Sequence, residues 1–366
     1  MTNQTKPNLL FAFSSESYQL WCSDKNAMAR LSSIANHSWL QLEGTQALNA
    51  SGYARFGPNE DDNSRDLLKA ALREVDALVI HDGSPLIDAD ILQHAPRLKF
   101  ICDVEGDRFG FRFNLDDCWQ AGVRTIDTNN GNSYPVAEWA LGLILISLRN
   151  AGTFFRGEIN SASYSASPED KSKIRDLFGR SVGLVGGGFI AQRLISFLRP
   201  FECDIVVHDP YISKAMAHSV GFDLASLEVV MQQDVVVCLV PITPATKGMI
   251  GKKELALMNP GAVFVNVSRG AVVETSALID RLRLGDIVAG LDVFDPEPIP
   301  QNHPIKSMSN VFLSPHVAAY GNGKITNFTL MIDELERHLS GLETRYDLTP
   351  SSRANRRGEP PIQSAQ

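Results

Sequence analysis

Three side chains suited to acid–base chemistry lie just after short apolar runs in the second half of the chain: Arg269, Glu297 and His316. Because the carboxyl ends of parallel strands meet at one edge of a sheet, we expect these side chains to converge. A histidine can carry a proton near neutral pH, and a carboxylate bonded to it favours the protonated ring. An arginine can hold a carboxylate group through two parallel hydrogen bonds. The set therefore fits a reaction in which negative charge develops on a carbonyl oxygen.

Each of these residues alone would also fit a structural role. Arg269 could pair with a structural carboxylate, Glu297 could cap a turn in the sequence DPEP, and His316 could lie on the surface. Their joint occurrence at strand ends favours the catalytic interpretation. Four other histidines lack such neighbours and are expected to be structural or surface residues: His81, His208, His218 and His303.

A glycine-rich turn precedes these residues. Residues 181–191 have the pattern of a strand, then G-x-G-x-x-A, then a helix. Gly186 permits the tight turn, and Gly188 lets the backbone approach a pyrophosphate, whose charge the helix N-terminus attracts. The next expected strand ends at Asp209, which can accept hydrogen bonds from ribose hydroxyls and would repel a 2′-phosphate. The pattern predicts a dinucleotide site that favours NAD, with NADP the weaker alternative because Lys214 lies nearby.

The elements that must position these residues follow a βαβ rhythm of short apolar runs and amphipathic helical patterns. The longest helical pattern starts near Pro135, and its apolar face around Trp139 is expected to lie in a core or a dimer interface. A polar stretch over residues 157–176 precedes the second βαβ series. A last helix over residues 325–339 precedes a tail rich in Pro, Ser and Arg.

Composition narrows the class of protein. The chain has 366 residues, a formal net charge of -8 and 44% hydrophobic residues. This length predicts more than one domain, and the acidic balance argues against a nucleic-acid partner. The five cysteines form no C-x-x-C pair, so we expect reduced thiols and no metal site. Without a signal peptide or a membrane-spanning run in the sequence, we expect a cytoplasmic protein with no membrane partner.

Several segments between roughly residues 75 and 320 resemble the D-isomer-specific 2-hydroxyacid dehydrogenase family. They read TNNGN-x-x-P-VAEWALGLIL, VGLVGGGFIAQRL, VPITPATKGMIG, LALMNPGAVFVNVSRGAVV, AGLDVFDPEPIP and NVFLSPHVA. The resemblance implies an α/β fold of two Rossmann-like doubly wound domains, with the NAD domain inserted into a discontinuous substrate domain. It also implies hydride transfer between NAD(H) and C2 of a 2-keto acid or D-2-hydroxy acid.

The resemblance implies a role for each candidate residue. Arg269 would clamp the carboxylate and carbonyl of the substrate, His316 would donate or accept the proton at the C2 oxygen, and Glu297 would be the partner of His316. Asp292 resembles the residue that holds the nicotinamide carboxamide. The cofactor contacts expected from the turn and from the resemblance are Gly186, Gly188, Phe189, Ile190, Asp209, Pro241, Val267, Ser268 and Asp292.

In the family that this chain resembles, a glycine-rich substrate loop of the form G-x-G-x-D usually follows the strand that ends here at Cys102. This chain departs from that pattern. After Cys102 this chain has the longer sequence DVEGDRFGFRFN. Glu105 and Gly106 lie nearest the position whose backbone N–H groups would hold the substrate carboxylate, so we assign them to substrate binding together with Arg269. By the resemblance, Asp82 stands at the position where phosphoglycerate-using members of the family have an Arg-Ser pair that helps bind phosphate. The negative charge of Asp82 would repel phosphate. Glyoxylate, hydroxypyruvate and bulkier 2-keto acids stay open.

These observations predict a substrate domain over residues 1–131 plus 318–345, an NAD-binding domain over 132–317, and a disordered tail over 346–366. The expected partners are a small 2-keto or 2-hydroxy acid and a second copy of the chain, since the family forms dimers through its NAD domains. The alternative function is a non-catalytic NAD-sensing interaction protein like the family-related corepressors. Retention of Arg269, Glu297 and His316 favours an enzyme.

Overall fold

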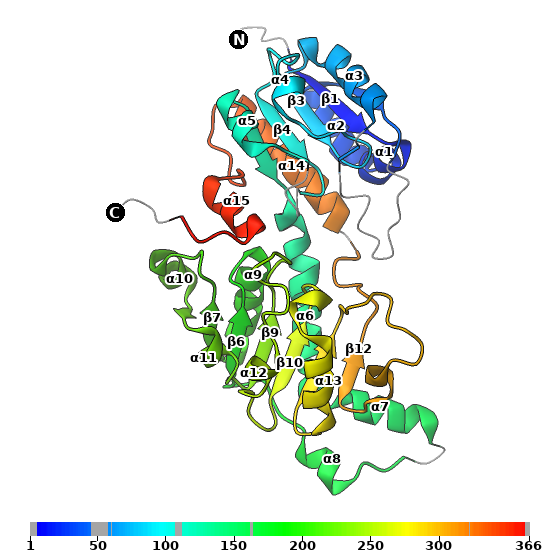
Figure 1. Cartoon of the computed structure of the whole chain (residues 1–366), viewed down its shortest axis with the longest axis vertical. Coiled ribbons are helices and arrows are strands. Elements are labelled where there is room, and N and C mark those ends of the chain that lie inside the picture. The colour runs from blue at the N-terminus through cyan, green and yellow to red at the C-terminus, as the bar shows by residue number, and fades with distance from the viewer. Residues whose placement is uncertain are drawn as a thin grey trace. The chain divides into compact units, whose positions relative to one another are not determined.

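The computed structural model describes residues 6–44, 58–59, 61–106, 112–161, 164–321 and 323–362. Its contacts divide the chain into two units: unit 1 contains residues 1–132 and 321–357, and unit 2 contains residues 133–320 and 358–366. Each unit contains a parallel sheet with helices (Figure 1), which confirms the expected α/β fold class. The middle of the expected substrate loop, residues 107–111, and the chain end, residues 363–366, lie outside the described residues.

Unit 1 is built on five parallel strands, counted over its described residues, in the order β2-β1-β3-β4-β5. The continuous apolar sequences of β1, β3 and β4 are buried, as expected for inner strands of a parallel sheet. The polar edge strand β2 has no such signal, and the sequence analysis missed it. The strands are β1 (Asn8–Phe13), β2 (Asn36–Gln41), β3 (Ala77–Ile80), β4 (Phe100–Asp103) and β5 (Arg124–Asp127).

The first three helices of unit 1 begin at polar caps. The side chains of Ser14, Asp24 and Asp61 each accept a backbone N–H from the first turn of the helix that follows. The late helix α14 packs Phe328 and Met331 into the core beside β1 and β4, which explains why the chain must return to this unit. The helices are α1 (Ser15–Trp21), α2 (Lys25–Ile34), α3 (Asp62–Ala71), α4 (Ala89–Leu92), α5 (Leu115–Gln120), α14 (Gly323–Leu339) and α15 (Pro350–Arg357).

The expectation of a disordered tail is wrong for residues 350–357, which form helix α15. Ala354 is only 1% exposed, and Arg356 forms an ion pair with Asp127 at the end of β5. The basic side chains that contributed to the expectation of disorder form ion pairs with acidic side chains of unit 1. A polar tail can fold in this way when a folded surface supplies partners for its charges.

Unit 2 contains seven parallel strands, counted where the structure describes it, in the order β12-β11-β10-β9-β6-β7-β8. The central strands are short and fully buried. The carboxyl ends of all these strands lie along one edge because every pairing is parallel. The strands are β6 (Ser181–Val185), β7 (Asp204–His208), β8 (Asp223–Leu224), β9 (Val235–Cys238), β10 (Val263–Asn266), β11 (Val288–Leu291) and β12 (Val311–Leu313).

Helix α6 (Ser133–Leu148) is the main helix on the sheet of unit 2, and Figure 1 shows it running along the strands. Ala140, Leu143 and Ile144 share one core cluster with β6, β9 and β10. Gly290 of β11 permits this approach, since an added Cβ would lie 2.8 Å from Oγ of Ser147. The other helices are α7 (Ala151–Asn160), α8 (Pro168–Ser172), α9 (Phe189–Leu198), α10 (Lys214–Val220), α11 (Leu227–Val230), α12 (Lys252–Leu255) and α13 (Thr275–Arg283).

Among the described residues, no helix is long and apolar enough to cross a membrane. The same residues contain no group of three His, Cys, Asp or Glu side chains that could hold a metal ion. The five cysteines are free thiols. Burial raises the pKa of Cys22 to about 12 and that of Cys238 to about 11.

Candidate active site

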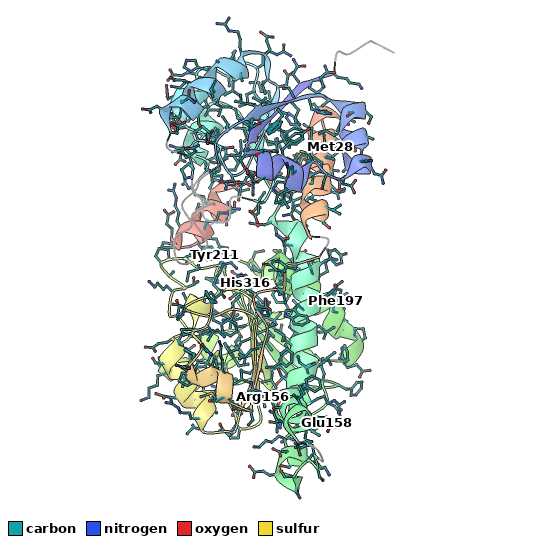
Figure 2. All side chains as sticks on the ribbon, turned by 90° about the vertical axis from the view of Figure 1, so that its right-hand side faces the viewer. Met28, Arg156, Glu158, Phe197, Tyr211 and His316 are labelled. Atoms are coloured by element: carbon teal, nitrogen blue, oxygen red, sulfur yellow. The ribbon has the colours of Figure 1, made fainter. Side chains whose placement is uncertain are left out.

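His316 and Glu297 form a hydrogen-bonded pair in unit 2. His316 Nδ1 lies 2.8 Å from Glu297 Oε2, and the second carboxylate oxygen, Oε1, accepts the backbone N–H of Phe294 at 2.7 Å. The His316 side chain is 36% exposed and that of Glu297 21%. The convergence expected from the sequence is therefore present for these two residues. In Figure 2, His316 and Tyr211 lie toward one end of unit 2, with Arg156 and Glu158 toward the other.

The carboxyl group of Glu297 is held in its charged form. Burial opposes this charge, but the hydrogen bonds from His316 and from the Phe294 N–H, with the positive charges of His316 and Arg269, outweigh burial and lower the pKa of Glu297. Because the carboxylate accepts at Nδ1, the ring proton stays on that nitrogen and Nε2 is the nitrogen that can gain or lose one. Among the described residues, no hydrogen-bond partner occupies Nε2 of His316.

The backbone at His316 has an uncommon conformation. Its φ of 53° lies in the left-handed region, which few residues other than glycine adopt, although histidine is enriched there. The backbone N–H of His316 donates to the carbonyl oxygen of Asp292 at 2.8 Å. The turn that presents the imidazole is therefore held by the end of the neighbouring strand β11.

Asp292 is fully buried at the end of β11, with 0% of its surface exposed. Its Oδ1 accepts the hydroxyl of Ser314 at 2.6 Å and the N–H of Val317 at 3.0 Å, and its Oδ2 accepts the N–H of Ala318 at 2.9 Å. The indole N–H of Trp139 also donates to Oδ1, at 3.2 Å. Asp292 was expected at the nicotinamide, and the structure shows its carboxylate bonded to the segment that carries His316.

Arg269 lies in the turn after β10. Its Nη1 donates to the Ser268 carbonyl oxygen at 2.6 Å, and Nδ2 of Asn266 donates to the carbonyl oxygen of Arg269 at 3.1 Å. At Gly270, an added Cβ would lie 1.9 Å from the backbone of Phe294. Only glycine fits this approach, which packs the Arg269 turn directly against the segment leading to Glu297. The charge of Arg269 is near enough to lower the pKa of that glutamate.

The glycine turn has the features that a dinucleotide requires. Gly186 has a φ of 101°, which suits glycine, and no described residue lies within 4 Å of a Cβ added at Gly188. Gly188 is the N-cap residue of α9 and, having no side chain, makes no side-chain cap hydrogen bond to the first turn. An uncapped helix N-terminus beside open space fits a pyrophosphate.

Asp209, the expected ribose ligand, lies beside this turn. Its Oδ2 accepts the N–H of Gly187 at 2.9 Å and its Oδ1 accepts that of Tyr211 at 2.8 Å. Each carboxylate oxygen can accept a further hydrogen bond, so the residue fits ribose hydroxyls as well as its two backbone donors. It also ties the glycine turn to the loop after β7.

The other expected cofactor contacts differ in exposure. Phe189 is exposed at the start of α9 and Ile190 is partly buried beside it. Pro241 is exposed in the loop after β9, and its carbonyl oxygen accepts the hydroxyl of Thr246. The side chains of Val267 and Ser268 are buried, and Ser268 bonds to Asn266. Val267 and Ser268 would therefore meet a cofactor mainly through their backbone.

Glu105 and Gly106 belong to unit 1, and their backbone N–H groups already have acceptors. The N–H of Glu105 donates to Oδ1 of Asp103 at 3.0 Å, and that of Gly106 donates to the Asp103 carbonyl oxygen at 2.9 Å. This tight turn does not support the expectation that both groups hold a substrate carboxylate. The turn follows β4, and the side chain of Asp103 stabilises it by accepting the N–H of Glu105.

The sequence analysis missed a polar chain at the strand ends of unit 1. Nε2 of His81 lies 2.9 Å from Glu105 Oε2, and Nδ1 of the same ring lies 2.8 Å from Ser17 Oγ. Ser14 Oγ lies 3.0 Å from Ser17 Oγ. The position of His81 directly after the apolar run of β3 was the available signal.

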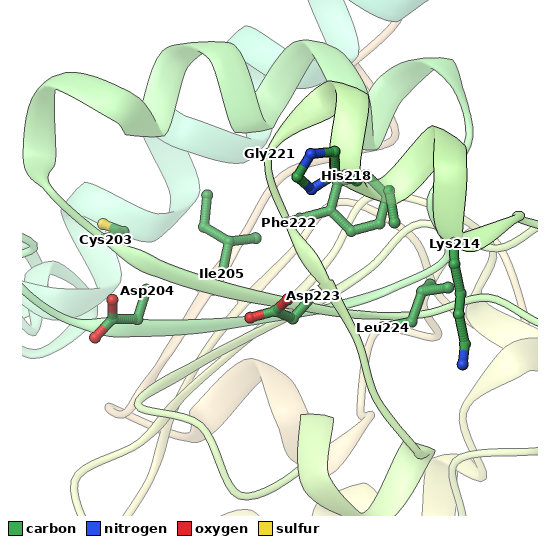
Figure 3. Close-up of a pocket in the computed structure, with 10 residues that line it drawn as sticks. Cys203, Asp204, Ile205, Lys214, His218, Gly221, Phe222, Asp223 and Leu224 are labelled. Carbon is green, nitrogen blue, oxygen red and sulfur yellow. The ribbon is translucent and has the colours of Figure 1, made fainter.

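A hollow lies elsewhere in unit 2. It has a volume of about 580 Å³ and is lined by β7, α10 and β8, including Cys203, Asp204 and His218 (Figure 3). Cys203 and Asp204 lie at the start of β7, whereas the glycine turn meets the other end of that strand. The hollow is therefore not the site of the residues described above.

Comparison with known proteins defines the family. Residues 141–318 match the NAD-binding domain of the D-isomer specific 2-hydroxyacid dehydrogenases. The chain is 34% identical over 272 residues to glyoxylate reductase from Thermococcus onnurineus, which covers 72% of this chain and 80% of that protein. The chain belongs to the D-isomer specific 2-hydroxyacid dehydrogenase family, as its motifs indicated, and the expected cofactor NAD is confirmed for the matched domain.

Two further relatives bear on length and fold. D-3-phosphoglycerate dehydrogenase from Methanocaldococcus jannaschii is 30% identical over 263 residues, 70% of this chain and 48% of that protein. The chain thus spans about half the length of the D-3-phosphoglycerate dehydrogenases that it matches. The solved structure of a phosphoglycerate oxidoreductase from Rhizobium etli matches with a TM-score of 0.77 at 24% identity, over 94% of this chain and 98% of that one. At this identity the likeness concerns the fold.

Proposed function

We propose that the protein is an NAD-dependent oxidoreductase that interconverts a 2-keto acid and a D-2-hydroxy acid. The observation that carries this proposal is the pair His316–Glu297, joined at 2.8 Å, with the charge of Arg269 close enough to act on the same carboxylate. Family membership and the glycine turn that fits a dinucleotide support it.

In this proposal, His316 carries the proton of the reaction. Glu297 holds a proton on Nδ1, so the imidazolium can release the Nε2 proton to the C2 oxygen during reduction and take it back during oxidation. The charged glutamate stabilises the positive charge of the imidazolium that this proton transfer requires. The tie between Phe294 and Glu297 Oε1 fixes the carboxylate in the orientation that this requires.

Arg269 holds the substrate. A guanidinium remains charged at all relevant pH values and can bind a carboxylate by two parallel hydrogen bonds while it stabilises negative charge on the neighbouring carbonyl oxygen. Gly186, Gly188 and Asp209 would hold the cofactor at the glycine turn. When bound, NAD(H) supplies or accepts the hydride.

The direct test is oxidation of NADH, followed by its absorbance, with a panel that includes glyoxylate, hydroxypyruvate, phosphohydroxypyruvate and larger 2-keto acids. We expect steady turnover with at least one acid and, for every acid whose 2-hydroxy product is chiral, production of the D enantiomer, checked by chiral chromatography. NADH binding without turnover on any panel member would overturn the proposal.

We also propose that the protein forms a homodimer through unit 2. Apolar side chains are exposed on two of its helices: Leu145 on α6, and Phe155 and Ile159 on α7. Phe155 and Ile159 are four residues apart and so share one face of α7, and neighbouring exposed apolar side chains of this kind can mark an interface. Sedimentation should show a dimer that Ile159→Asp weakens, and a monomeric wild-type protein would exclude it.

A further inference from the structure

The indole of Trp139 on α6 makes a polar contact that its apolar surroundings did not suggest. Its N–H lies 3.2 Å from Oδ1 of Asp292 and 3.1 Å from Oγ of Ser314. The ring is partly buried and packs against the main core of unit 2. One end of the side chain therefore fills space, and the other donates a hydrogen bond to a buried carboxylate.

Asp292 depends on such donors because its carboxylate is shielded from water. Four groups donate to it: the hydroxyl of Ser314, the backbone N–H groups of Val317 and Ala318, and the indole N–H of Trp139. Three of the four belong to the segment 314–318, which contains His316. The hydrogen bonds to this carboxylate thus hold the segment 314–318 in place.

Trp139 differs from the other three donors in its origin. Among the described donors to this carboxylate, it alone comes from α6, whose buried face is fixed on the sheet. Its N–H is shared with Ser314 Oγ, which itself donates to Asp292. These bonds connect a rigid helix to the segment that holds His316 in its left-handed conformation.

We propose that Trp139 is a positioning residue for His316: its indole N–H fixes Asp292 and Ser314, and these fix the backbone that presents the imidazole. The inference rests on the proposed function, because its consequence for turnover depends on His316 as the proton donor. The order of segment 314–318 follows from the same contacts and can be measured without turnover.

Two substitutions distinguish the contribution of the indole N–H from that of the size of the ring. Trp139→Phe keeps an aromatic ring and removes the donor. Trp139→His restores it, because Nε2 of imidazole stands at the same place in a five-membered ring as Nε1 of indole. A matched control is Trp39→Phe in unit 1, which also removes an indole hydrogen bond, here the one of 3.1 Å to the carbonyl oxygen of Phe13.

The first measurement is amide hydrogen exchange over residues 314–318 in the cofactor-free protein. Trp139→Phe should speed exchange there by on the order of tenfold, since a hydrogen bond to a charged group is lost. Trp139→His should return exchange toward the wild-type rate, and Trp39→Phe should leave it unchanged. Ser314→Ala, which removes the shared hydroxyl, should speed exchange in the same segment and serves if Trp139→Phe does not fold.

The second measurement is turnover. Trp139→Phe should lower kcat severalfold with the KM for NADH nearly unchanged, and Trp139→His should restore kcat. Exchange and kcat at wild-type values in Trp139→Phe would overturn the inference, as would a folded Trp139→His that rescues neither. A wild-type protein without turnover would count against the proposed function alone, because the exchange of residues 314–318 would still report on Trp139.

Discussion

Unit 1 and unit 2 each contain a histidine–glutamate pair, and the two pairs have nearly the same length. His316 meets Glu297 at 2.8 Å, and His81 meets Glu105 at 2.9 Å. They differ in the second ring nitrogen: Nδ1 of His81 is bonded to Ser17, whereas no described residue bonds Nε2 of His316. The His81 side chain is only 5% exposed, against 36% for His316. The distance between the partners is therefore alike in the two pairs, and the surroundings of the second ring nitrogen are what differ.

The surroundings of the two pairs strengthen this difference. Ser17 is buried and is bonded in turn to Ser14, so the imidazole of His81 belongs to a chain of polar side chains. Such a chain stabilises the fold when all members are satisfied and is costly when one is removed. His316 stands on a turn held from one side by Asp292. We therefore expect loss of His81 to affect stability and loss of His316 to affect chemistry.

The largest expected effect is on turnover in His316→Ala. Removing the proton donor should lower kcat on the order of 10²–10⁴-fold. The affinity for NADH should stay near that of the wild type, since the glycine turn is unchanged. Steady-state kinetics with the best keto acid and NADH titration by fluorescence measure the two quantities.

The matched variant for this experiment is His81→Ala. Its kcat, corrected for the folded fraction, should fall far less than that of His316→Ala. Equal losses in the two variants would break the comparison, and an unchanged kcat in His316→Ala would end the assignment of the proton donor.

The second effect is on stability in His81→Ala. Removal of this ring leaves Ser17 and Glu105 without their buried partner, which should lower the free energy of unfolding by about 2–3 kcal/mol. Urea denaturation followed by circular dichroism measures it. The partly exposed His316 serves as the control, and His316→Ala should cost less than about 1 kcal/mol. A larger loss in His316→Ala than in His81→Ala would contradict the structural role of the buried pair.

The third effect is on the pH profile in Glu297→Gln. The amide cannot stabilise the imidazolium by charge, so the pH above which keto-acid reduction declines should move down. Glu105→Gln should leave the profile in place, because our proposal assigns the proton of the reaction to His316 and not to His81. An unmoved profile in Glu297→Gln, or an equal shift in Glu105→Gln, would remove the distinction between the pairs.

The fold was largely predictable because the inner strands of a parallel sheet are continuous apolar runs. Residues 77–80 are a run of this kind and form β3. Edge and surface elements lack this signal: the polar β2 was missed, and α15 was taken for disorder because its stability comes from ion pairs with distant residues.

The candidate site was predictable where its contacts are local. His316 and Glu297 lie close in the sequence at the ends of adjacent strands, so their meeting follows from a parallel sheet. The bond between Trp139 and Asp292 joins residues 153 positions apart, and no periodicity of α6 reveals it. The N–H groups of Glu105 and Gly106 have acceptors within their own turn, which the sequence pattern did not indicate, and their role in substrate binding stays a prediction.

The smallest expected effect is a pH-dependent contribution of Glu297 to stability. Burial is outweighed by the hydrogen bonds from His316 and Phe294, so the pKa of Glu297 is lowered in the folded protein. A carboxyl group of this kind stabilises the fold fully above its unfolded-state pKa, about 4.3 for glutamate, and the contribution is lost as the pH falls through the folded-state value. Glu297→Gln should therefore be less stable than wild type by at most about 1 kcal/mol near neutral pH. Urea denaturation at a series of pH values should show this difference shrinking below pH 4.3, because the protonated glutamate and the glutamine are then both uncharged. A difference that grows on acidification would mean that the carboxyl group of Glu297 is not held in its charged form.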